Sequence, residues 1–152
     1  MAENNNHLVG KLPKTPHPKL KTLEPLIGKW KLTGPDVEGE VTFEWMEGGF
    51  FLIQKFDLHQ AGEHHKGVEY TGIDEETQTL RSRLMDIDGS RFTYTYEIDG
   101  DTFHYWFGDK GSKIYSRSKI SADGNSFEGA WHWTNEDGTP GGYEFSGTRV
   151  EE

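Results

Sequence analysis

One carboxylate and two tyrosines are the best candidates for acid–base chemistry in this sequence. Alternation along the strand that leads to Asp86 places this residue on a buried face. A buried carboxyl can transfer protons near neutral pH, with Tyr94 or Tyr105 as its proton donor or orienting partner. The simpler interpretation, which we favour, is that Asp86 lies at the solvated end of its strand, just before the Asp88-Gly89 turn.

Two histidines lie inside aromatic runs, DTFHYWFGDKGS at 101–112 and FEGAWHWTN at 127–135. A histidine that faced a cavity could bind a metal or take part in catalysis. Alternate residues of a strand share a face, and the aromatic residues beside each histidine favour the inner face for themselves. We therefore expect His104 and His132 on the outer face. Trp106 leaves an inward His104 open as an alternative, because tryptophan is rarely found on a fully solvated face.

A group of His59, Glu63, His64 and His65 resembles a set of metal ligands. His64 and His65 are adjacent on a predicted turn, however, and no second group with metal-ligand spacing accompanies them. The sequence contains no cysteine, which excludes disulfides, cysteine zinc sites and cysteine nucleophiles. It also lacks a glycine-rich phosphate loop and a nucleophile elbow. We expect no functional metal and no cofactor.

The elements that must position these residues are strands. After residue 34 the apolar residues recur with a period of two, and Gly, Asp and Asn clusters interrupt them roughly every 8–12 residues, which is typical of a sandwich or a barrel. One short helix is expected over 18–28, with Leu20, Leu23 and Ile27 at helical spacing. Residues 1–18 are expected to be a disordered leader, and 19–152 a single domain. The predicted strands cover 28–34, 39–47, 49–58, 66–73, 79–87, 91–98, 102–108, 112–121, 125–134 and 142–150.

Ten antiparallel strands in a row would leave two long edges exposed if the sheet stayed open. Closure removes both edges, so we predict an all-β, closed up-and-down barrel of about ten strands with one short helix. Odd and even strands run in opposite directions, which brings the start of the first strand and the end of the last to one end of the barrel. Trp30 and Arg149 should meet there, with the guanidinium stacked on the indole.

The segment LIGKWKLTG, with Gly28-Lys29-Trp30, resembles the opening Gly-x-Trp strand of the calycin superfamily of lipocalin, fatty-acid-binding and nitrobindin-like barrels. The segments EWMEGGFFLIQKFDL and KGVEYTGIDEETQTLRSRLMDIDG resemble the lipocalin-like barrels of a bacterial family of unknown function. The resemblance covers roughly residues 20–150 and implies that the Trp30–Arg149 pair is a structural plug. Nitrobindin-like barrels place an axial histidine near the end of the chain. The last predicted strand here has none, so haem is a less favoured alternative.

Strand alternation predicts which residues line the barrel interior, and the long segments 59–65 and 135–141 at the end away from Trp30 should form its rim or lid. The alternative is that the interior side chains fill the barrel and leave no cavity. The predicted lining is mostly aromatic, as in small-molecule pockets. It comprises Phe43, Gln54, Phe56, Tyr70, Leu84, Asp86, Tyr94, Tyr105, Phe107, Ser116, Trp131, Trp133 and Phe145.

Charge and composition narrow the function classes. The formal net charge of -10 argues against a nucleic-acid partner, and no apolar run is long enough to span a membrane. We expect a cytoplasmic protein, monomeric or homodimeric, that binds a small apolar or aromatic molecule as a carrier or sensor. The alternatives are an enzyme of the cyclase, isomerase or lyase type that uses the same cavity, and an interaction protein with a filled barrel.

Overall fold

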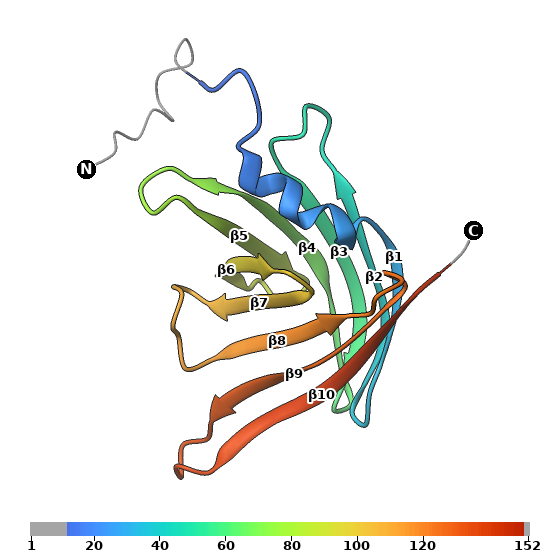
Figure 1. Cartoon of the computed structure of the whole chain (residues 1–152). Coiled ribbons are helices and arrows are strands. Elements are labelled where there is room, and N and C mark those ends of the chain that lie inside the picture. Colours follow the sequence, from blue (N-terminus) through green and yellow to red (C-terminus); the bar gives the residue numbers. More distant parts are fainter. Residues whose placement is uncertain (1–11, 151–152) are drawn as a thin grey trace.

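The computed structural model describes residues 12–150 and contains ten strands and one short helix (Figure 1). Residues 1–11 of the predicted leader lie outside the described residues. No helix in the described part of the chain combines the length and the apolar character that a membrane crossing needs. The strands are β1 (Gly28–Thr33), β2 (Val37–Trp45), β3 (Leu52–Gln60), β4 (Glu63–Asp74), β5 (Thr79–Asp86), β6 (Arg91–Asp99), β7 (Thr102–Phe107), β8 (Tyr115–Ile120), β9 (Ser126–Thr134) and β10 (Pro140–Arg149).

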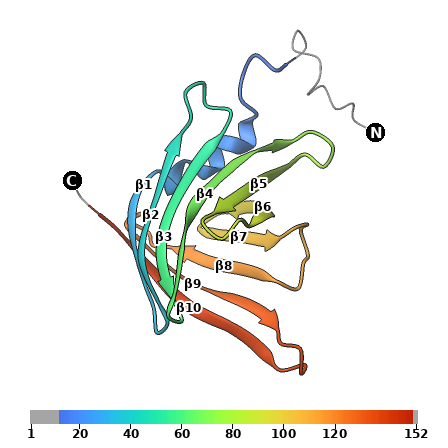
Figure 2. The same cartoon turned by 180° about the vertical axis from the view of Figure 1, so that it is seen from behind.

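The sheet is closed, which confirms the predicted antiparallel barrel. Each strand pairs with its neighbours in sequence, and β1 pairs with both β2 and β10. The first and the last strand of the sheet therefore pair with each other along the β1–β10 seam (Figures 1 and 2). We call the end at the β2–β3, β4–β5, β6–β7 and β8–β9 connections the floor, and the opposite end the mouth.

The helix at the floor is a 3₁₀ helix, η2 (Pro18–Leu26). Its buried residues are Leu20, Leu23 and Leu26, whereas the sequence analysis placed Ile27 on the buried face. A spacing of three residues matches the three residues per turn of a 3₁₀ helix, and Pro25 removes a backbone donor from the last turn. The three leucines pack with Trp30, Leu80 and Ile120 in one hydrophobic cluster, so η2 closes the floor.

Trp30 and Arg149 form the expected plug at the floor. They are directly paired across the β1–β10 seam, and the Arg149 Cζ atom lies 4.2 Å from the centre of the Trp30 ring. The Arg149 guanidinium donates hydrogen bonds to the carbonyl oxygens of Ile27, Pro25 and Gly124. Trp30 is fully buried, and its Nε1 donates to the Leu26 carbonyl oxygen at 2.8 Å. This plug links η2, both seam strands and the β8–β9 turn.

The β3–β4 hairpin differs from the prediction. The sequence analysis assigned 59–65 to a long loop, but β3 and β4 continue through it and are joined by Ala61 and Gly62 alone. Both turn residues have positive φ, 52° and 81°, as a two-residue type I′ turn requires. The β2–β3 connection is longer than predicted, because β3 begins at Leu52 rather than at 49. The end of β3 and the start of β4 consist of polar residues, so the sequence does not show the apolar alternation that would indicate a continuing strand.

Candidate ligand-binding cavity

The barrel encloses a cavity of about 370 Å³ that reaches from the floor to the mouth. Its wall includes Leu26 and Ile120 near the floor, and Gln60, Asp86 and Trp133 near the mouth. The volume falls in the range of small-molecule pockets, and most of the wall is aromatic or aliphatic. The interior is therefore not filled by side chains, contrary to the alternative left open by the sequence.

Most of the predicted lining residues lie on the cavity wall, and two do not. Ser116 is fully buried, but its side chain does not border the cavity. Tyr70 belongs to the other face of β4, where it pairs with Ile53. The predicted residues that line the cavity are Phe43, Gln54, Phe56, Leu84, Asp86, Tyr94, Tyr105, Phe107, Trp131, Trp133 and Phe145.

Glu69 occupies the interior position on β4 that the sequence analysis gave to Tyr70. It is directly paired with Gln54 of β3 and Leu84 of β5, both of which line the cavity. The prediction was wrong because apolar character favoured Tyr70 over its charged neighbour for the inner face. The Ala61-Gly62 turn was the signal that could have corrected it, since a two-residue turn pairs residue 54 with residue 69 and puts both on one face.

The carboxyl group of Glu69 is buried without a counter-ion. The side chain is 4% exposed, and no lysine, arginine or histidine in the described part of the chain forms an ion pair with it. Loss of water raises the pKa of Glu69 to about 8. The nearby Ser82 hydroxyl opposes this rise, but it has no partner that meets ordinary hydrogen-bond geometry. Glu69 is therefore mostly protonated near neutral pH.

Aromatic rings form much of the cavity wall to which Glu69 belongs. Tyr105 and Trp131 meet edge to face with ring centres 4.8 Å apart, and Tyr94 lies 6.1 Å from Trp131. Burial raises the pKa of Tyr94 and Tyr105 above its usual range, and the charge of Glu69 raises both further. Glu69 is thus close enough to both phenols to couple with them. Tyr96 adds a polar contact, since its hydroxyl donates to Gln54 Oε1 at 3.2 Å.

Asp86 lines the mouth of the cavity but is engaged in a turn. Its Oδ1 accepts hydrogen bonds from the backbone N–H groups of Asp88 and Ser90, at 3.0 and 2.9 Å. Partial burial works to raise the pKa of Asp86, but these hydrogen bonds outweigh it and hold the pKa below its usual range. Asp86 is therefore ionised near neutral pH and stabilises the β5–β6 turn, as in the simpler of the two interpretations drawn from the sequence.

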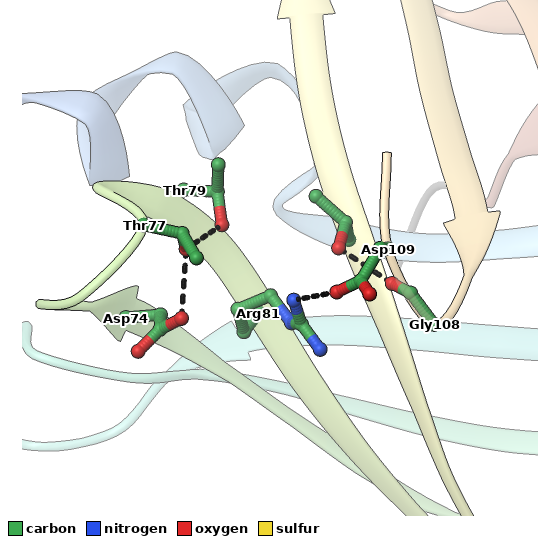
Figure 3. Close-up of polar contacts among 7 residues, drawn as sticks. Asp74, Thr77, Thr79, Arg81, Gly108 and Asp109 are labelled. Carbon is green, nitrogen blue, oxygen red and sulfur yellow. Dashed lines mark hydrogen bonds and ion pairs between the residues drawn. The ribbon is translucent and has the colours of Figure 1, made fainter. Parts of the chain in front are cut away.

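The mouth has an apolar rim. Ile87, Phe92 and Ile114 are exposed there, and the last two also border the cavity. Ile114 is the last residue of the β7–β8 loop, and Gly108 and Asp109 at the start of this loop contact β6 and β5 (Figure 3). In this contact the Thr95 hydroxyl donates to the Gly108 carbonyl oxygen at 2.6 Å, and Arg81 Nη1 donates to Asp109 Oδ1 at 2.6 Å.

The two predicted rim segments are compact. Residues 59–65 belong to the β3–β4 hairpin, with Gln60 and His65 on the cavity wall. The connection between β9 and β10 is closed by its own hydrogen bonds, because Asp137 Oδ1 accepts from both the backbone N–H and the hydroxyl of Thr139. This hairpin projects at the end opposite the helix (Figures 1 and 2). Whether either segment acts as a lid stays a prediction.

His104 and His132 do not border the cavity, which agrees with the expected outward positions. The His104 ring stacks on Trp106 with ring centres 5.6 Å apart, and the His132 ring stacks on Tyr115 at 5.0 Å. Arg117 Nε donates to His104 Nδ1 at 3.2 Å. Trp106 is thus covered on the outer face by its neighbours, which removes the reason for an inward His104.

A second histidine group lies on the outer face of the β3–β4 hairpin. The ligand atoms of Asp57, His59 and His64 lie within 4.8 Å of one another, and His64 Nε2 is 2.7 Å from Asp57 Oδ1. This hydrogen bond holds the pKa of Asp57 below its usual range. All three side chains are exposed, and the His59 ring stacks on the His64 ring with ring centres 4.5 Å apart.

Comparisons with known proteins establish the fold alone. No protein-family model matches the sequence, and no curated protein matches it. Among solved structures, the crystal structure of Rv2717c from M. tuberculosis is similar to this chain, with a TM-score of 0.58 and 16% sequence identity. The match covers 90% of this chain and 99% of that chain. Membership of the calycin superfamily therefore stays a prediction.

Proposed function

We propose that the protein binds one small, largely apolar or aromatic molecule inside the barrel, as a carrier or a sensor. The observation that supports this function is the open interior of about 370 Å³ with its aromatic wall. At roughly 30 Å³ for each water molecule, an empty cavity of this volume holds about a dozen waters. Their release by an apolar ligand, together with burial of the ligand's surface, supplies the driving force for binding.

The mouth supports the same function. Phe92 and Ile114 are at least 40% exposed and continue the apolar wall of the cavity out to the solvent. Exposed apolar side chains that join a pocket to the surface are typical of ligand entry sites. Phe92 contacts Phe107 edge to face, with ring centres 5.2 Å apart, so the rim and the wall form one apolar surface.

The function can be tested with N-phenyl-1-naphthylamine, an uncharged probe whose fluorescence rises in apolar surroundings. The wild-type protein should bind it saturably with one site. Leu84→Trp should weaken binding by about tenfold or more, because the indole would occupy space that Leu84 now leaves open.

Arg83→Trp is the matched control, since Arg83 is the next residue of β5 and faces solvent. It should bind the probe as the wild type does. Urea unfolding of both variants checks that each is folded. Absence of binding to the wild type, or equal binding by both variants, would overturn the proposed function.

A further inference from the structure

We propose that the ligand of this cavity carries a protonated amine, with the Glu69 carboxylate as its counter-ion and the rings of Tyr94, Tyr105 and Trp131 as its further contacts. The inference rests on the proposed function and adds the chemical class of the ligand. Its basis is the distribution of charge on the cavity wall and the place of Glu69 within it.

The cavity wall carries acidic groups and no permanent positive charge. Among the described residues that line it, the ionisable ones are Glu69, Asp86, His65 and several tyrosines, and none is a lysine or an arginine. Arg149, which stacks on Trp30 at the floor, is engaged with three carbonyl oxygens. A carboxylate or phosphate ligand would be buried here without a counter-charge, which is costly.

Glu69 lacks the partner that a buried carboxyl normally has. No lysine, arginine or histidine in the described part of the chain forms an ion pair with it, and the described cavity wall contains neither lysine nor arginine. Buried ionisable groups are usually paired, and a group left unpaired on a cavity wall calls for an explanation. An ammonium group entering the cavity would supply the missing charge and donate hydrogen bonds to the carboxylate.

The aromatic rings that share the cavity wall with Glu69 suit the same ligand. Tyr94 and Tyr105 couple electrostatically with Glu69, and Trp131 contacts both of these tyrosines. Aromatic faces attract a cation that lies within about 6 Å of the ring centre, and the attraction is strongest where water is excluded. The same rings would pack against an aromatic or aliphatic body attached to the amine, which agrees with the apolar remainder of the wall.

A ligand with a neutral hydrogen-bond acceptor is the competing class, because a protonated Glu69 could donate to a carbonyl oxygen. The net charge of -10 and the absence of a cation from the described wall favour the ammonium. The two classes differ in their proton balance. An ammonium that binds beside an ionised Glu69 displaces the carboxyl proton to solvent, whereas a neutral acceptor keeps that proton in place.

The experiment compares 2-(1-naphthyl)ethylamine with 2-(1-naphthyl)ethanol, which have nearly the same shape and differ in charge. Titration calorimetry near pH 7 should give the amine an affinity at least about tenfold higher than the alcohol in the wild type. Glu69→Gln keeps the shape of the side chain and should reduce this preference to about twofold or less. Glu44→Gln, which changes an exposed carboxylate paired with Lys55 on the outer face, should keep the wild-type preference.

The pH dependence provides a second readout. Amine binding should release close to one proton, and the amine affinity should rise as the pH increases toward 8 and then level off. In Glu69→Gln this slope should disappear. Tyr94 and Tyr105 line the same cavity as Glu69 and remain protonated in this range, since burial raises the pKa of each. Tyr143, Asp86 and His65 also border the cavity, and comparison with Glu69→Gln at each pH removes their contribution.

The outcomes separate this inference from the proposed function. If N-phenyl-1-naphthylamine binds but the amine and the alcohol bind equally, or the preference persists in Glu69→Gln, the ligand class is wrong and the binding function stands. If none of the three probes binds the wild type, the proposed function fails as well. Urea unfolding of Glu69→Gln confirms that its lost preference does not come from a lost fold.

Discussion

At the scale of single residues, Glu69 and Asp86 show how position decides the chemistry of a carboxyl group. Asp86 accepts two backbone hydrogen bonds at the solvated mouth and is held ionised. Glu69 lies on the adjacent strand β4, opposite Leu84, and is therefore two positions further from the mouth than Asp86. Burial there keeps its carboxyl group protonated. An acid–base role, for which Asp86 is the best candidate in the sequence, is chemically better suited to Glu69. The enzymatic alternative itself stays a prediction.

Glu69→Gln should remove a pH dependence of the free energy of unfolding. The pKa of Glu69 is raised from its ordinary value of 4.5 to about 8 in the folded chain, so folding takes up a proton between these pH values. The stability that Glu69 contributes is greatest below pH 4.5 and decreases by up to about 1.4 kcal/mol per pH unit as the pH rises toward 8. Urea unfolding should therefore show that the free energy of unfolding of Glu69→Gln rises relative to that of the wild type as the pH increases from 4.5 to 8.

Asp86→Asn is the control for this measurement, because a lowered pKa gives the opposite sign. The variant should be less stable than the wild type by a constant amount near neutral pH, and this difference should shrink as the pH falls through the acidic range, where the Asp86 carboxylate of the wild type becomes protonated. A difference between Glu69→Gln and the wild type that stays constant from acidic to mildly basic pH would show that Glu69 is not buried as described.

At the scale of elements, the sequence predicted strand identity better than strand ends. Alternation on β9 placed Trp131 and Trp133 inward and His132 outward, as the structure has them. The same rule failed on β4. There Val68 and Tyr70 make the outer face the more apolar one, whereas the inner face carries Glu69. Alternation of apolar and polar residues identifies the inner face of a strand only where the outer face is solvated. Around Tyr70 the outer face is itself half-buried, so residue type alone could not decide the orientation.

The β3–β4 turn offers a prediction with a stabilising sign. Ala61 has a φ of 52°, a left-handed conformation that costs an alanine about 1 kcal/mol. Asparagine tolerates this conformation better, and Asn-Gly is the preferred pair in a type I′ turn. Ala61→Asn should therefore raise the free energy of unfolding by about 0.5–1 kcal/mol. Thermal unfolding measures the change.

The same hairpin supplies the control and the contrary outcome. Gly62→Ala places a methyl group in open space but at a φ of 81°, so it should destabilise the protein by about 1 kcal/mol through backbone strain alone. Neither change should alter binding of N-phenyl-1-naphthylamine, because the register of β3 and β4 is kept. A destabilised Ala61→Asn would show that the turn is not of the two-residue type.

At the scale of the whole molecule, closure of the barrel could be predicted because it follows from counting strands and from the cost of open edges. The meeting of Trp30 and Arg149 follows from the same count and is confirmed. The size of the cavity could not be predicted in this way. It depends on how far the side chains of residues such as Phe56 and Tyr96 extend into the barrel, and alternation gives only their direction.

The Trp30–Arg149 plug should carry a large share of the stability of the closed barrel. Arg149→Met keeps much of the side-chain volume but removes the stacked cation and leaves three carbonyl oxygens without their donor. These carbonyls belong to η2, to Ile27 between η2 and β1, and to the β8–β9 turn, so the loss affects three separate segments at the floor. Hydrogen bonds to charged groups and a cation–π contact together predict a loss of about 2–4 kcal/mol.

Lys55→Met tests whether the effect belongs to the floor. It also replaces a cation by methionine, but Lys55 is exposed and forms a surface ion pair with Glu44, so its loss should cost less than about 1 kcal/mol. Urea unfolding followed by tryptophan fluorescence should show one cooperative transition for both variants, at a lower urea concentration for Arg149→Met. Equal stabilities of the two variants would mean that hydrogen bonding along the β1–β10 seam closes the barrel without the plug, and that Arg149 is dispensable to the fold.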